Sequence, residues 1–134
     1  MRSKKSAFII SNYLMFQRGL KNLLVQQAKI EIVGATESPD QAIEQVKSLH
    51  PDVVILDSTN MPGDPLVSLK HIFHAYPHVK VICLNLHSNQ LAIYQAVQQR
   101  AMIEYRVFKW KVEDIADLFQ AISYNFRPSP LITT

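Results

Sequence analysis

The sequence has few of the residues on which many small enzymes depend. It contains three glycines, at positions 19, 34 and 63, and a single cysteine, Cys83, in 134 residues. With so few glycines, no Gly-rich phosphate-binding loop follows a predicted strand, which excludes a dinucleotide fingerprint and a P-loop. A lone cysteine excludes an internal disulfide and is typical of proteins of a reducing cytoplasm.

Long apolar runs are missing too. None approaches the roughly 18 residues of a membrane span, and the apolar stretch after Lys5 is too short for a signal peptide. The net charge is +3, but the basic residues are scattered, and only Arg2, Lys4 and Lys5 cluster. We therefore expect a cytoplasmic protein with no membrane partner, and the charge alone is weak support for nucleic-acid binding.

Short β-branched runs alternate with helical segments along the whole chain. The runs cover residues 7–10, 30–34, 53–56, 79–84 and 103–108, and apolar residues recur at helical spacing in 16–24, 42–49, 66–73, 93–97 and 115–122. Val53–Leu56 and Val81–Leu84 are continuously apolar, which is typical of parallel strands covered on both faces. Ser38 and Asp64, each followed by proline, predict helix starts.

This alternation predicts an α/β domain of three layers, doubly wound around a five-stranded parallel sheet. In such a sheet the functional groups gather beyond the carboxyl ends of the strands. The residues expected there are Ser11, Asn12, Thr36, Glu37, Asp57, Ser58, Asn85, Leu86, Lys109 and Trp110. No pair of nucleophile and base is visible among them, so we expect no catalytic residues and no enzyme.

Several motifs occur in an order that suggests a family. They are the Phe-x-x-Gly-Leu pattern at Phe16–Leu20, the Val-Gly-Ala strand at Val33–Ala35, the run Pro51–Asp57, and Met61-Pro62-Gly63 after the aspartate. This order resembles the receiver domains of LuxR/NarL-type two-component response regulators over roughly residues 6 to 124. The resemblance implies a CheY-like, flavodoxin-like (βα)5 fold, with a receiver domain over residues 1–125.

The resemblance also assigns roles in a phosphorylation site. Asp57 takes the place of the phosphoacceptor, but the two metal-binding acids are replaced by Ser11 and Asn12. The switch residues correspond to Asn85, where the family has Ser or Thr, to Tyr105, and to Lys109, with Phe108 as the alternative for the lysine position. Since Mg2+ is held mainly by carboxylates and waters, a site charge reduced from about −3 to about −1 predicts weak or absent Mg2+ binding and no cofactor.

Two interpretations of Asp57 remain open. In the first, Asp57 pairs with Lys109 and accepts hydrogen bonds from Asn12 or Asn85, which locks one signalling state without phosphate. In the second, Asp57 is a remnant at a solvated strand end.

The leading hypothesis is an atypical receiver that regulates transcription, independently of phosphorylation, by dimerisation or by docking a partner protein. One alternative is a conventional phosphoacceptor, phosphorylated on Asp57 by a histidine kinase. Another is a sensor of a cyclic dinucleotide. Arg127 lies where such receivers carry their arginine motif, but its neighbours do not reproduce that motif.

Candidate interface residues come from the face that this family uses for dimers and docking. They are Tyr94, Arg106 and Trp110, although Trp110 equally fits a core-capping role. Residues 126–134 form a Pro-bearing linker or tail, which in the family leads to a helix-turn-helix domain. DNA binding is expected only through such a domain, which is not present in this chain. His71, His74 and His78 are not expected to bind metal, because Pro77 separates His78 from the helix of the other two.

Overall fold

The computed structural model describes residues 4–27, 29–61, 64–99, 102–113 and 115–123. Six strands form one sheet, in the order β2-β1-β3-β4-β5-β6. The strands are β1 (Lys5–Ile10), β2 (Ile30–Thr36), β3 (Val53–Asp57), β4 (Lys80–Asn85), β5 (Gln90–Gln99) and β6 (Met102–Lys111). The helices are α1 (Leu14–Val25), α2 (Pro39–Leu49), α3 (Pro65–Ala75) and α4 (Ile115–Ser123).

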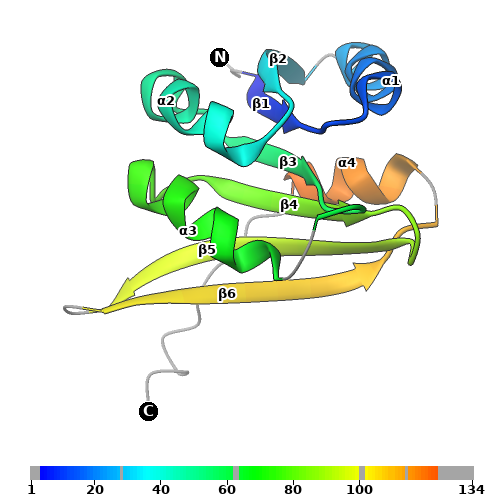
Figure 1. Ribbon diagram of the computed structural model, residues 1–134. Helices are drawn as coiled ribbons and strands as arrows, with labels where there is room; N and C mark the ends of the chain where they lie inside the picture. The colour runs from blue at the N-terminus through cyan, green and yellow to red at the C-terminus, as the bar shows by residue number, and fades with distance from the viewer. Residues whose placement is uncertain (1–3, 28, 62–63, 100–101, 114, 124–134) are drawn as a thin grey trace.

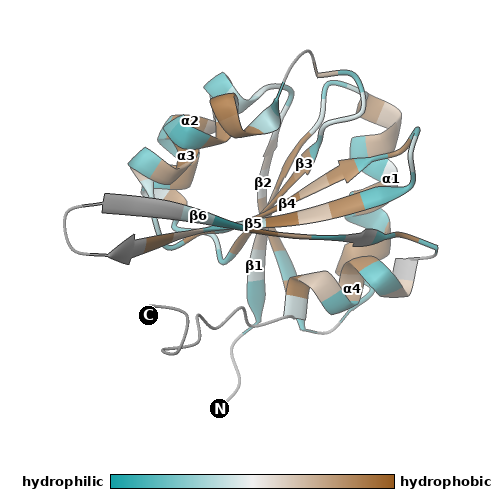
Figure 2. Ribbon diagram, turned by 90° about the horizontal axis from the view of Figure 1, so that it is seen from below, coloured by the Kyte–Doolittle hydropathy of each residue, from teal (hydrophilic) through white to brown (hydrophobic). Residues whose placement is uncertain are grey.

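The helices cover the sheet on both faces, so the domain has three layers. Helices α1 and α4 lie on one face, and α2 and α3 lie on the other (Figure 2). Alternate residues of the central strands supply the two cores, as the pleat requires. Ile9 and Ile55 pack toward α1 and α4, whereas Phe8 and Val54 pack toward α2 and α3. Among the described residues, none of the helices is long and apolar enough to cross a membrane.

The α/β class and its doubly wound beginning are confirmed. β1, β2, β3 and β4 pair in parallel, with α1, α2 and α3 as the connections between them (Figure 1). The expected caps are present: the Ser38 hydroxyl accepts a hydrogen bond from the Gln41 N–H, and the Asp64 carboxylate accepts one from the Leu66 N–H. Proline follows each cap, where its missing N–H costs nothing.

The end of the sheet differs from the sequence prediction. The segment containing Ile93 and Val97, which was expected to be a helix, is strand β5, and β6 runs antiparallel to it rather than parallel to β4. A spacing of four residues fits the strand period of two as well as a helical turn. Ile93 is buried toward α1 and α4, while its neighbour Tyr94 is buried toward α2 and α3. Apolar residues on both faces favour a covered strand here.

Lys80 joins the start of β4 to the end of α4. Its side chain is buried, and its ammonium donates hydrogen bonds of 3.0 and 2.6 Å to the carbonyls of Ala121 and Ile122. A cation at these last carbonyls satisfies acceptors that a helix leaves open and favours the negative end of its dipole. Burial, with a smaller effect from the charge of Lys5, lowers the pKa of Lys80 from 10.5 to about 8, against an opposing effect of Asp52.

We therefore expect Lys80 to make the fold more stable as the pH rises from about 8 toward 10. In this window the unfolded chain still holds the proton that folded Lys80 has lost, so the free energy of unfolding increases with pH. The measurement is the difference in free energy of unfolding between the natural chain and Lys80→Met, by urea titration at several pH values. A difference that is flat or that falls with pH contradicts this assignment.

Gly34 lets β2 pass close to a core aromatic ring. A Cβ at this position would lie 2.6 Å from Cε2 of Phe8, whose ring is fully buried. Because a packed core has little room to move, we expect Gly34→Ala to destabilise the fold by about 1–3 kcal/mol. Gly19→Ala is the control: a Cβ there meets nothing within 4 Å, and alanine should stabilise α1 by up to about 1 kcal/mol. Equal effects of the two substitutions in urea denaturation would contradict the close approach.

Candidate functional site

The candidate site lies where β1 and β3 end side by side. Ile10 is paired with Leu56 in the parallel register, so the next residues, Ser11 and Asp57, come together at the carboxyl edge of the sheet. The Ser11 hydroxyl donates a hydrogen bond of 2.9 Å to Oδ2 of Asp57. The two residues are 46 positions apart in sequence, and adjacent parallel strands bring them into contact.

Ser11 is held firmly in this position. It is 1% exposed, and its Oγ accepts a hydrogen bond of 3.1 Å from the Tyr13 N–H. The buried Gln17 side chain donates to the carbonyls of Ser11 and Thr36, which ties the first turns of α1 to the ends of β1 and β2. A serine hydroxyl has one hydrogen to donate. Of its two possible acceptors, Oδ2 of Asp57 at 2.9 Å is nearer than the Tyr13 carbonyl at 3.4 Å, so we assign the hydrogen to Asp57.

The second oxygen of Asp57 is also engaged. Oδ1 accepts a hydrogen bond of 3.1 Å from the Thr59 N–H, and the Thr59 hydroxyl accepts one of 2.9 Å from the Leu86 N–H. Both the N–H and the hydroxyl of Ser58 donate to the Leu84 carbonyl. The first two residues of the loop after β3, Ser58 and Thr59, are therefore bound to the Asp57 carboxylate and to the end of β4.

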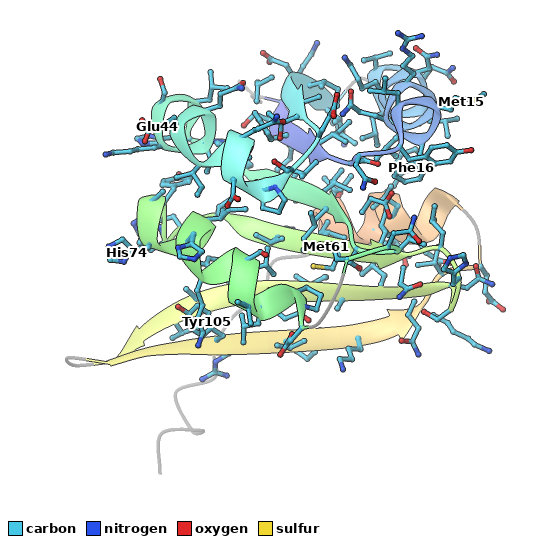
Figure 3. All side chains as sticks on the ribbon, in the orientation of Figure 1. Met15, Phe16, Glu44, Met61, His74 and Tyr105 are labelled. Atoms are coloured by element: carbon cyan, nitrogen blue, oxygen red, sulfur yellow. The ribbon has the colours of Figure 1, made fainter. Side chains whose placement is uncertain are left out.

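Asp57 borders a pocket of about 260 Å3 at this edge. The pocket is lined by Ile10, Asn12, Glu37, Ser38, Pro39, Gln41, Leu56, Asp57, Asn60 and Met61, and Figure 3 shows Met61 in the loop beyond β3. Glu37 brings a second carboxylate to the pocket. The strand-end rule placed Glu37 at this edge, but no role was expected for it. Within the described ranges, no group of three or more His, Cys, Asp or Glu residues could hold a metal ion.

The hydrogen bonds described at Asp57 come from residues other than the expected Asn12 and Asn85. Asn12 is exposed and lines the pocket, but the described hydrogen bonds to Asp57 come from Ser11 and Thr59. Asn85 is engaged elsewhere: its Oδ1 accepts hydrogen bonds from the N–H groups of His87 and Ser88. Short polar side chains commonly close turns in this way, so Asn85 shapes the turn from β4 into β5.

The expected ion pair between Asp57 and Lys109 was also wrong. Lys109 lies in β6, opposite Ala92 of β5, and β6 is three strands away from β3. Neighbouring strands are about 4.8 Å apart, which separates the two backbones by about 14 Å. Lys109 is exposed. The separation arises because β5 pairs with β4. The segment predicted to be the fifth strand, β6, therefore lies one strand farther from β3 than expected.

The remaining predicted residues are distributed over β5 and β6. Tyr105 extends from β6 toward α3 (Figure 3), where its ring packs against Phe73 with centroids 5.4 Å apart. Tyr94, a candidate interface residue, is 7% exposed, and burial raises the pKa of its hydroxyl. Arg106 is half-buried. The backbone of Trp110 pairs with Leu91, but its side chain lies outside the described part, as do residues 126–134 and Arg127.

Comparison with known proteins places this geometry in a family. Residues 7–122 match the family described as the response regulator receiver domain. The chain belongs to the response regulator receiver family. Asp57 ends β3 at the edge of the sheet where the sequence resemblance predicts the phosphorylation site. That Ser11 and Asn12 take the places of the acidic pair stays a prediction.

Individual relatives support the assignment. The chain is 30% identical to the transcriptional regulatory protein DegU of Brevibacillus brevis over 66% of its own length and 37% of DegU. It is 33% identical to a protein-glutamate methylesterase/protein-glutamine glutaminase of Methanosarcina mazei, over 57% of its length and 21% of that protein. The chain thus spans less than two fifths of the length of each of these relatives.

Solved structures show the same fold. The signal receiver domain of the response regulator NarL from Mycobacterium tuberculosis superposes with a TM-score of 0.56 at 23% identity, over 63% of this chain and 68% of that one.

The contact between Ser11 and Asp57 can be measured by a double-mutant cycle. Because the acceptor is a carboxylate, we expect Ser11→Ala and Asp57→Ala to show a coupling energy of about 1–2 kcal/mol in urea denaturation. Ser6 is the matched control, since it makes the equivalent contact with Asp52 at the other end of the same strand pair. Asp57→Ala and Ser6→Ala should be additive. Additivity in both cycles would contradict the Ser11 contact.

Proposed function

We propose that this receiver domain signals without phosphorylation and regulates transcription by dimerising or by docking a partner protein. The observation that carries the proposal is the hydrogen bond from the buried Ser11 hydroxyl to the Asp57 carboxylate. It provides a neutral donor at the place where the family's metal-binding acids would stand. The same bond favours the locked-state interpretation over that of a solvated remnant, although with Ser11 rather than Lys109 as the partner.

The donor set at the site does not fit Mg2+. Ser11 and Asn12 contribute neutral oxygens, and each oxygen of Asp57 already accepts a hydrogen bond. Mg2+ gives up its waters reluctantly and is usually held by carboxylates in octahedral geometry. Glu37 is exposed at the rim of the pocket and does not replace a pair of acids beside Asp57.

The described residues near Asp57 also offer little charge stabilisation for phosphoryl transfer. The transferred group carries negative charge on three oxygens, and enzymes stabilise it with metal ions and cationic side chains. The lysine assigned to that task, Lys109, lies about three strand spacings from β3. The described surroundings of Asp57 thus lack both the pair of acids that would hold a metal ion and the lysine that would contact the transferred group.

Regulation would pass through the loops that this site organises. The loop after β3 is tied to Asp57 by the Thr59 N–H and to Leu86 by the Thr59 hydroxyl. In this arrangement the loop would present one defined surface for a partner to recognise. Control of DNA would be exerted through a separate binding domain in a cytoplasmic transcription factor, in keeping with the chain's similarity to a transcriptional regulatory protein. No histidine kinase is required.

A conventional phosphoacceptor is the second candidate. It is favoured by the pocket of about 260 Å3 that Asp57 borders, which gives a phosphodonor access. The two candidates differ in what happens when the chain meets Mg2+ and a small phosphodonor. The cyclic-dinucleotide alternative rests on Arg127, which lies outside the described residues.

We expect no covalent adduct on Asp57 when the chain is incubated with Mg2+ and acetyl phosphate and then measured by intact-protein mass spectrometry. The double variant Ser11→Asp, Asn12→Asp should gain a metal-dependent phosphoryl adduct, and adding Asp57→Ala should abolish it. Because Ser11 is buried, its replacement can unfold the domain, so Asn12→Asp alone, at an exposed position, serves as the second variant and should raise Mg2+ affinity. A saturable, Mg2+-dependent adduct on the natural chain would refute the proposal.

A further inference from the structure

The last strand of the sheet offers an open edge. β6 is ten residues long and pairs with β5 along its whole length. Its other side faces no strand within the described ranges, and no labelled helix lies beyond it in Figure 1. An edge strand of this kind presents a row of backbone donors and acceptors to another chain.

The hydrogen-bond pattern identifies which residues of β6 point outward. The Val112 N–H donates to the Asn89 carbonyl, which extends the β5–β6 register by one pair. Because bonded and non-bonded pairs alternate in an antiparallel ladder, Arg106 and Phe108 direct their backbone groups toward β5. Tyr105, Val107 and Lys109 therefore direct theirs away from the sheet.

The two edges of the sheet are not equally protected. On the β2 side, the register with β1 shifts between Ala7 and Phe8, and β2 contains Gly34; irregularities of this kind discourage further pairing. β6 has neither proline nor glycine between positions 102 and 111, and its pairing with β5 is regular throughout. Val107 is 39% exposed near its middle. The β6 edge is the one suited to accept another strand.

An antiparallel register centred on Val107 lets β6 pair with a second copy of itself without opposing like charges. Directly opposed residues of an antiparallel pair point to the same face of the sheet. When a twofold axis perpendicular to the sheet relates two identical strands, one residue must therefore lie opposite its own copy, and the axis runs midway between the two. An axis at Arg106 would oppose two guanidinium groups, and an axis at Lys109 would oppose two ammonium groups. An axis at Val107 avoids both and still pairs almost the whole strand.

The Val107-centred register also brings favourable pairs together. Arg106 comes opposite Phe108 of the second copy, and Tyr105 comes opposite Lys109 of the second copy, each twice by symmetry. Cations opposite aromatic rings at cross-strand positions are attractive contacts. Phe108 is 38% exposed in the single chain, so such a contact would remove apolar surface from water.

We propose that a second copy of this chain pairs with β6 in antiparallel fashion about Val107, which joins two six-stranded sheets into one continuous sheet. The inference deepens the dimerising function proposed above and rests on it. It names a backbone edge as the interface, in place of the side-chain surface expected from Tyr94 and Trp110. Pairing of this type needs no phosphate and no metal, in keeping with a site that uses neither.

Cysteine crosslinking tests the register directly. In the Val107→Cys chain the two new thiols face each other across the axis, with Cβ atoms about 5 Å apart, so a mild oxidant should convert most of the protein into a disulfide-linked dimer. Lys109→Cys is the matched control, because two copies of position 109 lie four residues apart along the paired strands and should not crosslink. Native Cys83 is buried, and burial raises the pKa of its thiol, so it should not compete.

A second variant tests whether dimerisation depends on the outward backbone edge of β6. Val107→Pro removes an outward N–H while sparing the bonds to β5, so the domain should fold but sediment as a monomer where the natural chain sediments as a dimer. A natural chain that dimerises without crosslinking through Val107→Cys would overturn the β6 interface and leave the proposed function standing. A natural chain that stays monomeric at high concentration would overturn the β6 interface and the dimer form of that function together.

Discussion

The hydrogen bond between Ser11 and Asp57 is the contact on which the rest of the functional edge depends. Parallel pairing of β1 and β3 puts the two residues side by side, and Gln17 fixes the backbone of Ser11 from α1. A lone carboxylate at a strand end needs either a cation or hydrogen-bond donors. Here the donors are a serine hydroxyl and the Thr59 N–H, so each oxygen of the carboxylate accepts a hydrogen bond.

The hairpin of β5 and β6 also shapes the functional edge, because it determines which side chains lie near Asp57. It carries Lys109 outward to the border of the sheet and leaves Tyr105 under α3, in contact with Phe73. In the described part of the chain, the same hairpin puts a strand with no further partner strand, instead of a helix, at this end of the sheet. One change in chain geometry therefore weakens the electrostatics of phosphoryl transfer and creates a surface for pairing, which is consistent with a receiver that signals by association.

Much of the fold could be predicted from the sequence because its signals were redundant. β3 and β4 are continuously apolar, and the starts of α2 and α3 carry capping residues followed by proline. The segment containing Ile93 had only a spacing of four, which fits helix and strand equally. Its structure is settled by burial on two faces, and burial depends on the rest of the fold. The meeting of Ser11 with Asp57 followed from the strand-end rule, but the choice of Ser11 over Asn12 as donor depends on side-chain direction, which spacing does not determine.

We propose that the Ser11 hydroxyl provides, for the Asp57 carboxylate, the contact that a metal ion would otherwise make. It is tested most directly by titrating Mg2+ with beryllofluoride into the 15N-labelled natural chain while the backbone amide signal of Thr59 is followed by NMR. The Thr59 N–H donates to Asp57, so occupation of the carboxylate would shift its resonance. We expect no saturable shift up to millimolar Mg2+. A saturable shift of Thr59 that Asp57→Ala abolishes would contradict it.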